Sequence, residues 1–360
     1  MKKNCVGVLT IPNAENYGSV LQSYGQKIFL ENFHVDVTVI NYKPEYLNGR
    51  YRIINIDFST VKRFIKSTAS SLLNFGNSVI KKKKFNDFRK RYLELKKPDC
   101  KKIEQIKNFD AIVVGGDQLW NTRITKYNKC FFLDNCEIKQ KIAFSVSFGY
   151  VDKSEEEDEF FRKYINNFDA IYTRENYDVN YVRSIFKSES VGYVLDPTLL
   201  INESEWDKIS SKRLIKDDYI LVYCFGEDSQ IINTANRLKK KYKLDVYIIN
   251  NSIKRVNKNN YINVRKVGPN DFVSLFKYAK YVVTNSFHGV AFSIIYKKNF
   301  KCIPYVGTEG RMISLVNLLK LDLSLDLEDL ESNLVYSEAN KMINAERKKA
   351  QDIIKKLLEV

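Results

Sequence analysis

Short apolar runs alternate with longer runs of helical periodicity from the start of the chain. CVGVLTI at 5–11 is typical of a buried strand, and VDVTVINY at 35–42 predicts the next one. Between them, apolar residues fall at helical spacing: Val20, Leu21, Tyr24, Ile28 and Phe29. A strand, a helix and a strand in succession predict a parallel sheet with a right-handed crossover.

The same alternation continues through the first half of the chain. Four further apolar runs predict strands, at 111–121, 142–150, 170–176 and 190–201. The region 50–108 is basic and weakly periodic, and it predicts a helical excursion packed on the sheet. Residues 1–200 are therefore expected to form one Rossmann-like domain.

A polar stretch at 202–218 predicts a linker with a connecting helix, after which the pattern begins again. The elements predicted next are strands at 219–228 and 244–250, helices at 229–241 and 270–279, and a strand in YVVTNS. We expect residues 201–340 to form a second Rossmann-like domain that faces the first across a central cleft, an α/β fold with two parallel sheets. The amphipathic helix at 341–360 is expected to pack back on the first domain.

Composition supports two folded domains and leaves the class of ligand open. The chain has 360 residues, of which 44% are hydrophobic and 13% aromatic, enough to bury two cores. The net charge of +16 favours acidic ligands, an anionic membrane surface or nucleic acid, and a lysine-rich solvated surface explains it equally well. No nucleic-acid motif accompanies the basic runs, so nucleic acid is not an expected partner.

The sequence does not predict a disulfide framework, a metal site or a membrane span. The six cysteines form no C-x-x-C and no cluster with histidine, so reduced thiols and a cytoplasmic location are expected. The N-terminal apolar run is short and predicts a first strand, not a signal peptide. No apolar run reaches the ~18 residues of a membrane span, and a peripheral position at the inner face of the membrane stays open.

Polar turns follow several predicted strands, at the edge where doubly wound sheets bind ligands. NYGS contains Asn16 and Gly18, and the glycine would let a ligand approach the main chain. GGDQLWN contains Gly115, Gly116 and Asp117 at the end of another strand. A glycine after a strand is more often only a turn residue. Asp117 is a candidate base for a hydroxyl, with capping of the turn as the alternative.

His288 is one of only two histidines in a chain with 22 Phe and 23 Tyr. It lies in TNSFHG, directly after a predicted strand, beside Asn285, Ser286 and Gly289. Ser286 is a candidate N-cap, which places His288 in the first turn of a helix. The helix dipole disfavours an imidazolium there but attracts an anion, and a bound phosphate or carboxylate would restore the proton. A structural histidine at a strand–helix turn is the alternative.

Two arginines are candidates for binding an anion. Arg174, in YTREN, follows a predicted strand and is expected to point toward the cleft. An ion pair with Glu175 is the alternative for this arginine. Arg311, in GTEGR, follows the strand-like KCIPYV and is expected to lie in a similar place.

Three further residues are assigned to the framework of the site. Asp196, directly before a proline, is expected to fix the turn between the domains. Trp120 and Tyr17 have rings that could stack on a sugar, and packing in the core is the preferred interpretation.

Taken together, these runs resemble the polysaccharide pyruvyl transferase family. The matching pieces occur in the family's order over about residues 5–312: NYGSVLQSYG, VVGGDQLWN, SVSFG, YTREN, LDPTLL and TNSFHGVAFSIIYKK. The resemblance implies a GT-B-like fold, with the first domain on the acceptor side. It also implies transfer of the pyruvyl unit of phosphoenolpyruvate to two sugar hydroxyls, as a cyclic ketal in a capsule, exopolysaccharide or cell-wall glycan.

The resemblance assigns donor binding to Arg174 and His288. The family also has a basic residue after the helix and strand that follow the histidine, and only Arg311 is suitably placed here. Phosphoenolpyruvate would be a substrate, so no cofactor is expected, and the acceptor could be lipid-linked, nucleotide-linked or polymeric. The first rival is a GT-B glycosyltransferase with a nucleotide-sugar donor. The non-enzymatic rival is a basic scaffold or nucleic-acid-binding protein.

Overall fold

The computed structural model describes residues 4–44, 76–95, 102–226, 228–249, 260–304, 309–321 and 336–360. Within these ranges the first half of the chain forms a parallel sheet with the spatial order β2-β1-β3-β4-β5-β6. Its strands are β1 (Cys5–Leu9), β2 (Asp36–Val39), β3 (Ala111–Gly115), β4 (Gln140–Val146), β5 (Ala170–Thr173) and β6 (Val191–Tyr193). All five residues of β3 are buried, as expected for a parallel strand covered on both faces.

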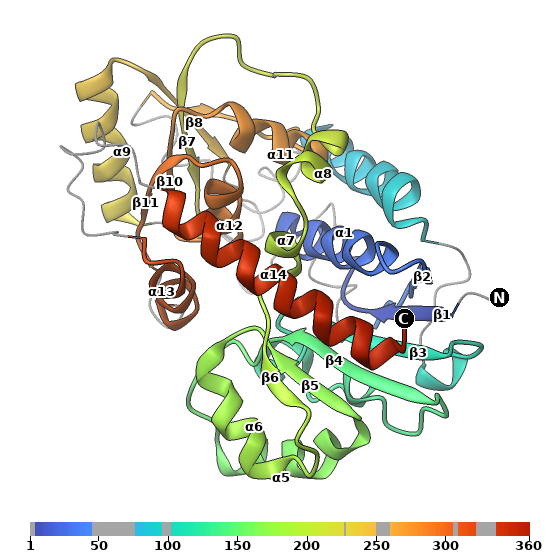
Figure 1. The fold of residues 1–360 in the computed structure, drawn as a ribbon. Helices are drawn as coiled ribbons and strands as arrows, with labels where there is room; N and C mark the ends of the chain where they lie inside the picture. Colours follow the sequence, from blue (N-terminus) through green and yellow to red (C-terminus); the bar gives the residue numbers. More distant parts are fainter. Residues whose placement is uncertain are drawn as a thin grey trace, which may run out of the picture.

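Helices cover both faces of this sheet. They are α1 (Tyr17–Glu31), a helix at 76–88 that continues into the π-helical turn η1 (Arg89–Leu93), α4 (Thr122–Thr125), α5 (Glu155–Tyr164) and α6 (Val179–Ile185). Single 3₁₀ turns occur as η2 (Ile103–Gln105), η3 (Lys129–Phe132), η4 (Ile165–Asn167) and η5 (Asn176–Asp178). In Figure 1, α5 and α6 lie on the opposite side of the sheet from α1.

The second half of the chain forms another parallel sheet, in the order β11-β10-β7-β8-β9 among the described residues. Its strands are β7 (Tyr219–Tyr223), β8 (Asp245–Ile249), β9 (Ile262–Asn263), β10 (Tyr281–Thr284) and β11 (Asn299–Cys302). Its helices are α9 (Ser229–Tyr242), α11 (Pro269–Tyr278), α12 (Phe287–Ile295) and α13 (Glu309–Leu318). The prediction of an α/β fold with two Rossmann-like halves is confirmed.

Three helices join the two halves. The polypeptide passes from β6 through α7 (Pro197–Leu200) and α8 (Glu203–Ile209) into β7. The last helix, α14 (Tyr336–Leu358), then runs back across both halves (Figure 1). Tyr336 donates its hydroxyl proton to the main-chain oxygen of Lys298 in the second half, and Asn4 in the first half bonds the main-chain oxygen of Leu358.

The observed ends of some elements differ from the sequence prediction. The strand predicted at 190–201 ends at Tyr193, because Asp196 caps α7 by accepting the Thr198 N–H at 2.9 Å. Pro197, at the first helical position, has no N–H to contribute to a strand ladder. This confirms the turn-fixing role expected of Asp196. Residues 50–75 and 96–101 of the predicted excursion lie outside the described residues.

The two sheet orders place a strand reversal in each half. In the first sheet β1 lies between β2 and β3, and in the second β7 lies between β8 and β10. Ligands of doubly wound sheets bind beyond the carboxyl ends of the strands at such reversals. The loops after β1, β3, β7 and β10 are therefore the places to look for a site.

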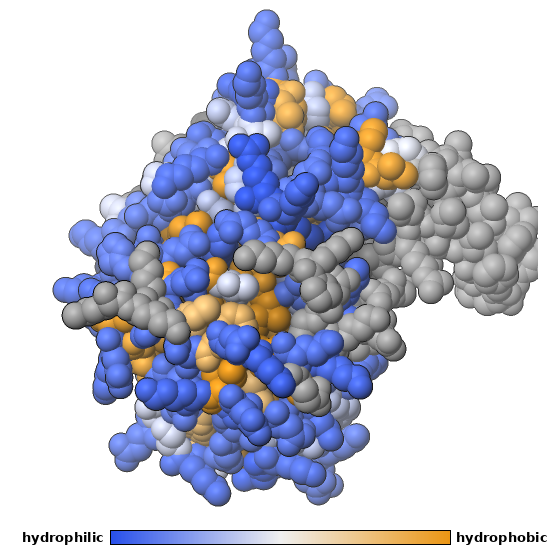
Figure 2. Space-filling model, turned by 90° about the vertical axis from the view of Figure 1, so that its right-hand side faces the viewer, coloured by the Kyte–Doolittle hydropathy of each residue, from blue (hydrophilic) through white to orange (hydrophobic). Residues whose placement is uncertain are grey.

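The face of the molecule shown in Figure 2 is mostly hydrophilic, in line with the abundance of charged residues.

Candidate active site

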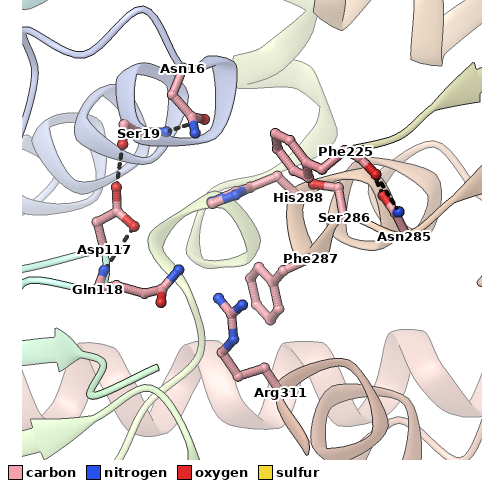
Figure 3. Close-up of a pocket in the computed structure, with 10 residues that line it drawn as sticks. All are labelled: Asn16, Ser19, Asp117, Gln118, Phe225, Asn285, Ser286, Phe287, His288 and Arg311. Carbon is pink, nitrogen blue, oxygen red and sulfur yellow. Dashed lines mark hydrogen bonds between the residues drawn. The ribbon is translucent and has the colours of Figure 1, made fainter. Parts of the chain in front are cut away.

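One cavity lies where the two strand reversals face each other. It has a volume of about 240 Å³ and is lined from both halves of the molecule. Figure 3 shows its lining: Asn16, Ser19, Asp117 and Gln118 from the first half, and Phe225, Asn285, Ser286, Phe287, His288 and Arg311 from the second. The prediction that polar turns from separate strands meet at one cleft agrees with this arrangement.

Two helices begin at this cavity. Asn16 caps α1 and accepts the Ser19 N–H through its side chain, and Ser286 is the N-cap of α12, as predicted. The Ser286 side chain makes no capping hydrogen bond, so the first N–H groups of α12 keep their capacity to bind an anion. Neither helix has an acidic residue in its first turn. Both termini therefore favour negative charge in the cavity.

His288 lies in the first turn of α12, and its imidazole packs directly on α1. A Cβ built on Gly18 would lie only 2.1 Å from Nδ1 of His288, so glycine is required for this approach. Nε2 of His288 lies 3.8 Å from Oδ2 of Asp196 and has no hydrogen-bond partner in the described structure. Only 12% of the side chain is exposed.

Burial lowers the pKa of His288, and the nearby positive charges of Arg174 and Arg311 lower it further. The carboxylates of Asp196 and Asp117 act in the opposite direction without reversing the shift. The imidazole is therefore neutral near pH 7, and an anion placed beside it would favour the charged form.

Arg311 reaches the cavity from α13, with its guanidinium directed toward the space between Gln118 and Phe287 (Figure 3). Its Nε is buried and has no hydrogen-bond partner among the described residues. Burial and the charge of Arg174 lower its pKa. This arginine brings positive charge to the cavity that no described ion pair neutralises.

Arg174 occupies a different place from the one predicted. The sequence predicted that it points into the cleft, but its side chain is only 1% exposed and does not line the cavity. Its Nε lies 2.9 Å from Glu175 and its Nη1 lies 3.1 Å from Asp196. Its guanidinium packs on the ring of Phe287, 4.6 Å from the centroid. Arg174 therefore supports the cavity wall from behind, and the alternative of an ion pair with Glu175 is observed.

Asp117 lines the wall opposite the second half. Its Oδ2 accepts a hydrogen bond from the Ser19 hydroxyl, and its Oδ1 accepts the Gln118 N–H at 2.7 Å. Both oxygens are thus held in place, with a serine hydroxyl at the cavity beside one of them. Ser19 and Gln118 were not predicted as site residues, although both lie in polar turns that the sequence singled out.

The sequence itself identifies the family. The profile described as polysaccharide pyruvyl transferase matches residues 16–306, most of the chain and all of the cavity lining except Arg311. The chain belongs to the polysaccharide pyruvyl transferase family. As a member it is a transferase of polysaccharide biosynthesis with a sugar or polysaccharide acceptor. A comparison with curated protein sequences gives no match.

Two solved structures share the fold of this pyruvyl transferase family member. UDP-GlcNAc 2-epimerase from Neisseria meningitidis bound to UDP-GlcNAc is 14% identical, with 100% of each chain covered and a TM-score of 0.52. The S. aureus MnaA–UDP structure is 12% identical, with 100% of this chain and 97% of that chain covered and a TM-score of 0.50. Likeness at these identities extends to the fold alone.

Four glycines predicted to bind substrate are explained by packing instead. A Cβ on Gly115 would lie 1.8 Å from the Phe144 oxygen, and one on Gly116 would lie 1.8 Å from Gln22 Oε1. Gly116 also adopts a left-handed φ of 87°. Gly289 packs against Thr284, and Gly18 packs against His288. None of these four glycines is among the described residues that line the cavity.

The aromatic residues Trp120 and Tyr17 pack in the core, which was the preferred interpretation of the sequence. Trp120 is fully buried and donates its indole N–H to the Phe131 oxygen at 3.1 Å. Tyr17 stacks on Phe272 with a centroid distance of 4.7 Å and bonds the Val267 oxygen. Their rings are therefore used in the framework of the pyruvyl transferase fold.

Within the described residues, no group of His, Cys, Asp and Glu side chains has the arrangement of a metal site. Over the same part of the chain, every helix is too short or too polar to cross a membrane.

Proposed function

We propose that this family member transfers the pyruvyl group of phosphoenolpyruvate to two hydroxyls of a sugar, forming a cyclic ketal of a capsule, exopolysaccharide or cell-wall glycan. The observation that carries the proposal is a convergence on one cavity of two helix N-termini, a largely buried neutral histidine and an arginine that has no ion-pair partner among the described residues. Phosphoenolpyruvate carries a phosphate and a carboxylate, so it offers one anionic group for each helix terminus.

Charge balance supports the same donor. The free cavity contains Arg311 without an ion-pair partner in the described structure, and the anionic groups of a bound donor would neutralise its charge. The same anion would raise the pKa of His288 from its lowered value and return a proton to the ring. Donor binding should therefore take up a proton, and donor affinity should fall as the pH rises.

The reaction requires proton transfers at both substrates. Protonation of the donor's methylene carbon makes C2 electrophilic, and one sugar hydroxyl adds there and loses its proton. The bond from C2 to the phosphate oxygen then breaks, and phosphate leaves with one proton as hydrogen phosphate. The second hydroxyl adds to C2 and loses its proton, so one ketal and one phosphate form from each donor and diol.

We assign the acid to His288 and the base to Asp117. His288, once charged by the donor's anions, is the group that would deliver a proton to the methylene carbon. Asp117 lies on the acceptor side, where its oxygens are oriented by the Ser19 hydroxyl and the Gln118 N–H. A sugar hydroxyl near Ser19 could lose its proton to this carboxylate directly or through the serine. Arg174 would act indirectly, by holding Asp196 and Phe287.

Titration calorimetry with phosphoenolpyruvate tests this function without an acceptor. We expect wild-type protein to bind it and His288→Ala to bind about 10- to 100-fold more weakly, the effect of losing one charge-assisted hydrogen bond. His34→Asn is the matched control, because His34 is the other histidine, is exposed and has a left-handed φ of 58° that asparagine tolerates. UDP is titrated in parallel. Binding of UDP without binding of phosphoenolpyruvate would contradict the proposal and favour a nucleotide-sugar glycosyltransferase.

A further inference from the structure

Phe225 is an aromatic residue of the cavity that the proposed reaction leaves without a role. It lies two residues beyond the end of β7, lines the cavity, and leaves 49% of its surface exposed. Over the described ranges, the other large apolar side chains with similar exposure, such as Leu214 at 48%, do not line it. Exposing a phenyl ring to water is unfavourable, so a half-exposed ring at a binding cavity points to a ligand with an apolar face.

The structure holds this residue in place with a dedicated side chain. Asn285, which is buried, accepts the Phe225 N–H at 2.8 Å and donates to the Phe225 oxygen at 2.9 Å. Both polar atoms of the Asn285 amide are thus used to fix the main chain of one neighbouring residue. The ring also packs edge-on against Tyr223, with 5.5 Å between centroids. Phe225 is therefore an ordered platform and not a loosely placed surface residue.

The donor cannot explain such a platform. Phosphoenolpyruvate is a small trianion without a ring, and the groups that suit it are helix termini, Arg311 and His288. A pyranose ring, by contrast, has a face of C–H groups that packs well on an aromatic ring. We infer that Phe225 is the stacking platform for the pyranose ring of the acceptor sugar. This inference rests on the proposed pyruvyl transfer and adds a residue for the second substrate.

The arrangement of the cavity suits this assignment. Asp117 and Ser19 come from the first half of the molecule, and Phe225 comes from the second, with His288 between them in Figure 3. A sugar that rests one face on Phe225 can direct its hydroxyls across the cavity toward the carboxylate of Asp117. The same sugar would hold its diol next to a donor at the start of α12. Phe225 would thus select pyranose acceptors by shape, while Asp117 acts on their hydroxyls.

Saturation-transfer NMR on the full-length protein tests the inference. The probes are methyl β-D-glucopyranoside, methyl β-D-galactopyranoside and methyl α-D-mannopyranoside, each with and without phosphoenolpyruvate. For at least one probe we expect transfer to the protons of one ring face, with about 2- to 10-fold weaker binding by Phe225→Ala, the usual contribution of an aromatic contact. Phe225→Trp should keep the transfer. Leu214→Ala, which removes an equally exposed apolar side chain away from the cavity, should bind like wild type.

Three results would overturn the inference. They are equal pyranoside binding by wild type and Phe225→Ala, no saturation transfer from wild-type protein to any of the three pyranosides, and preferential transfer to the uracil protons of UDP.

Calorimetry with phosphoenolpyruvate separates this inference from the proposed donor. Phe225→Ala should bind phosphoenolpyruvate like wild type, whereas failure of wild-type protein to bind it would refute the donor. Asn285→Ala keeps the Phe225 ring but removes both hydrogen bonds that hold the main chain of Phe225. We expect this variant to weaken pyranoside binding as Phe225→Ala does.

Discussion

Gly18→Ala should disable the candidate site by displacing His288, while helix α1 stays intact. The added Cβ would lie 2.1 Å from Nδ1 and 2.6 Å from Cε1 of His288. Carbon atoms in ordinary contact are about 3.5 Å apart or more, so the imidazole must move by about 1 Å or more. Gly18 is in the first turn of α1 with ordinary helical geometry, so alanine causes no backbone strain there. Alanine instead favours the helix by about 0.5–1 kcal/mol.

The size of the effect follows from how strongly the reaction depends on position. A displacement of about 1 Å in a catalytic group costs about 100-fold in rate. We therefore expect Gly18→Ala to release phosphate from phosphoenolpyruvate about 100-fold more slowly than wild type, or slower still. The melting temperature should stay close to that of wild type, because the gain in helix propensity offsets part of the repacking around His288. Donor affinity should fall toward that of His288→Ala.

A double-mutant cycle shows whether the loss acts through the histidine. In His288→Ala the space next to Gly18 is empty, so adding Gly18→Ala should cost almost nothing further, and the two losses should not add. Calorimetry and phosphate release are measured for wild type, both single variants and the double variant. Wild-type affinity and rate in Gly18→Ala would refute the reasoning, as would additive losses in the double variant.

Three further substitutions separate catalysis, support and packing. Arg174→Met leaves two buried carboxylates without their partner, so the free energy of unfolding in urea should fall by about 3–5 kcal/mol; unchanged stability would contradict the supporting role. Asp117→Asn should keep the phosphoenolpyruvate dissociation constant but slow acceptor-dependent phosphate release by about 10²- to 10⁴-fold, and a rate near wild type would exclude it as the base. Trp120→Phe should lower the free energy of unfolding by about 1 kcal/mol through its lost hydrogen bond, and altered pyranoside binding would contradict its place in the core.

The sequence was most informative where local rules decide the outcome. Ser286 before an apolar helix predicts an N-cap, and this placed His288 in the first turn of α12, where the structure has it. The alternation of strands and helices likewise predicted two parallel sheets. Strand ends were less certain, since β6 ends early where Asp196 and Pro197 begin α7.

Contacts between distant segments could not be predicted in the same way. Nothing in the local sequence indicates that Gly18 packs against His288, because the two residues come from different halves of the fold. Arg174 was expected at the cleft because it directly follows a predicted strand, but its side chain turns into the interior, where two carboxylates compensate its charge. Phe225 went unnoticed because an aromatic residue after a buried strand is usually part of the core, and only its exposure shows otherwise.

The most direct test of the account is the protonation state of His288 with and without phosphoenolpyruvate. The chain has only two histidines, so labelling histidine with nitrogen-15 gives a spectrum in which His288 and His34 can be assigned by substitution. At pH 7 we expect a neutral imidazole at His288 in the free protein, because burial lowers its pKa. Saturating phosphoenolpyruvate should convert it to an imidazolium, while His34 stays unchanged and UDP has no effect. An unchanged His288 spectrum at saturating phosphoenolpyruvate would contradict the claim that the donor's anions charge this histidine.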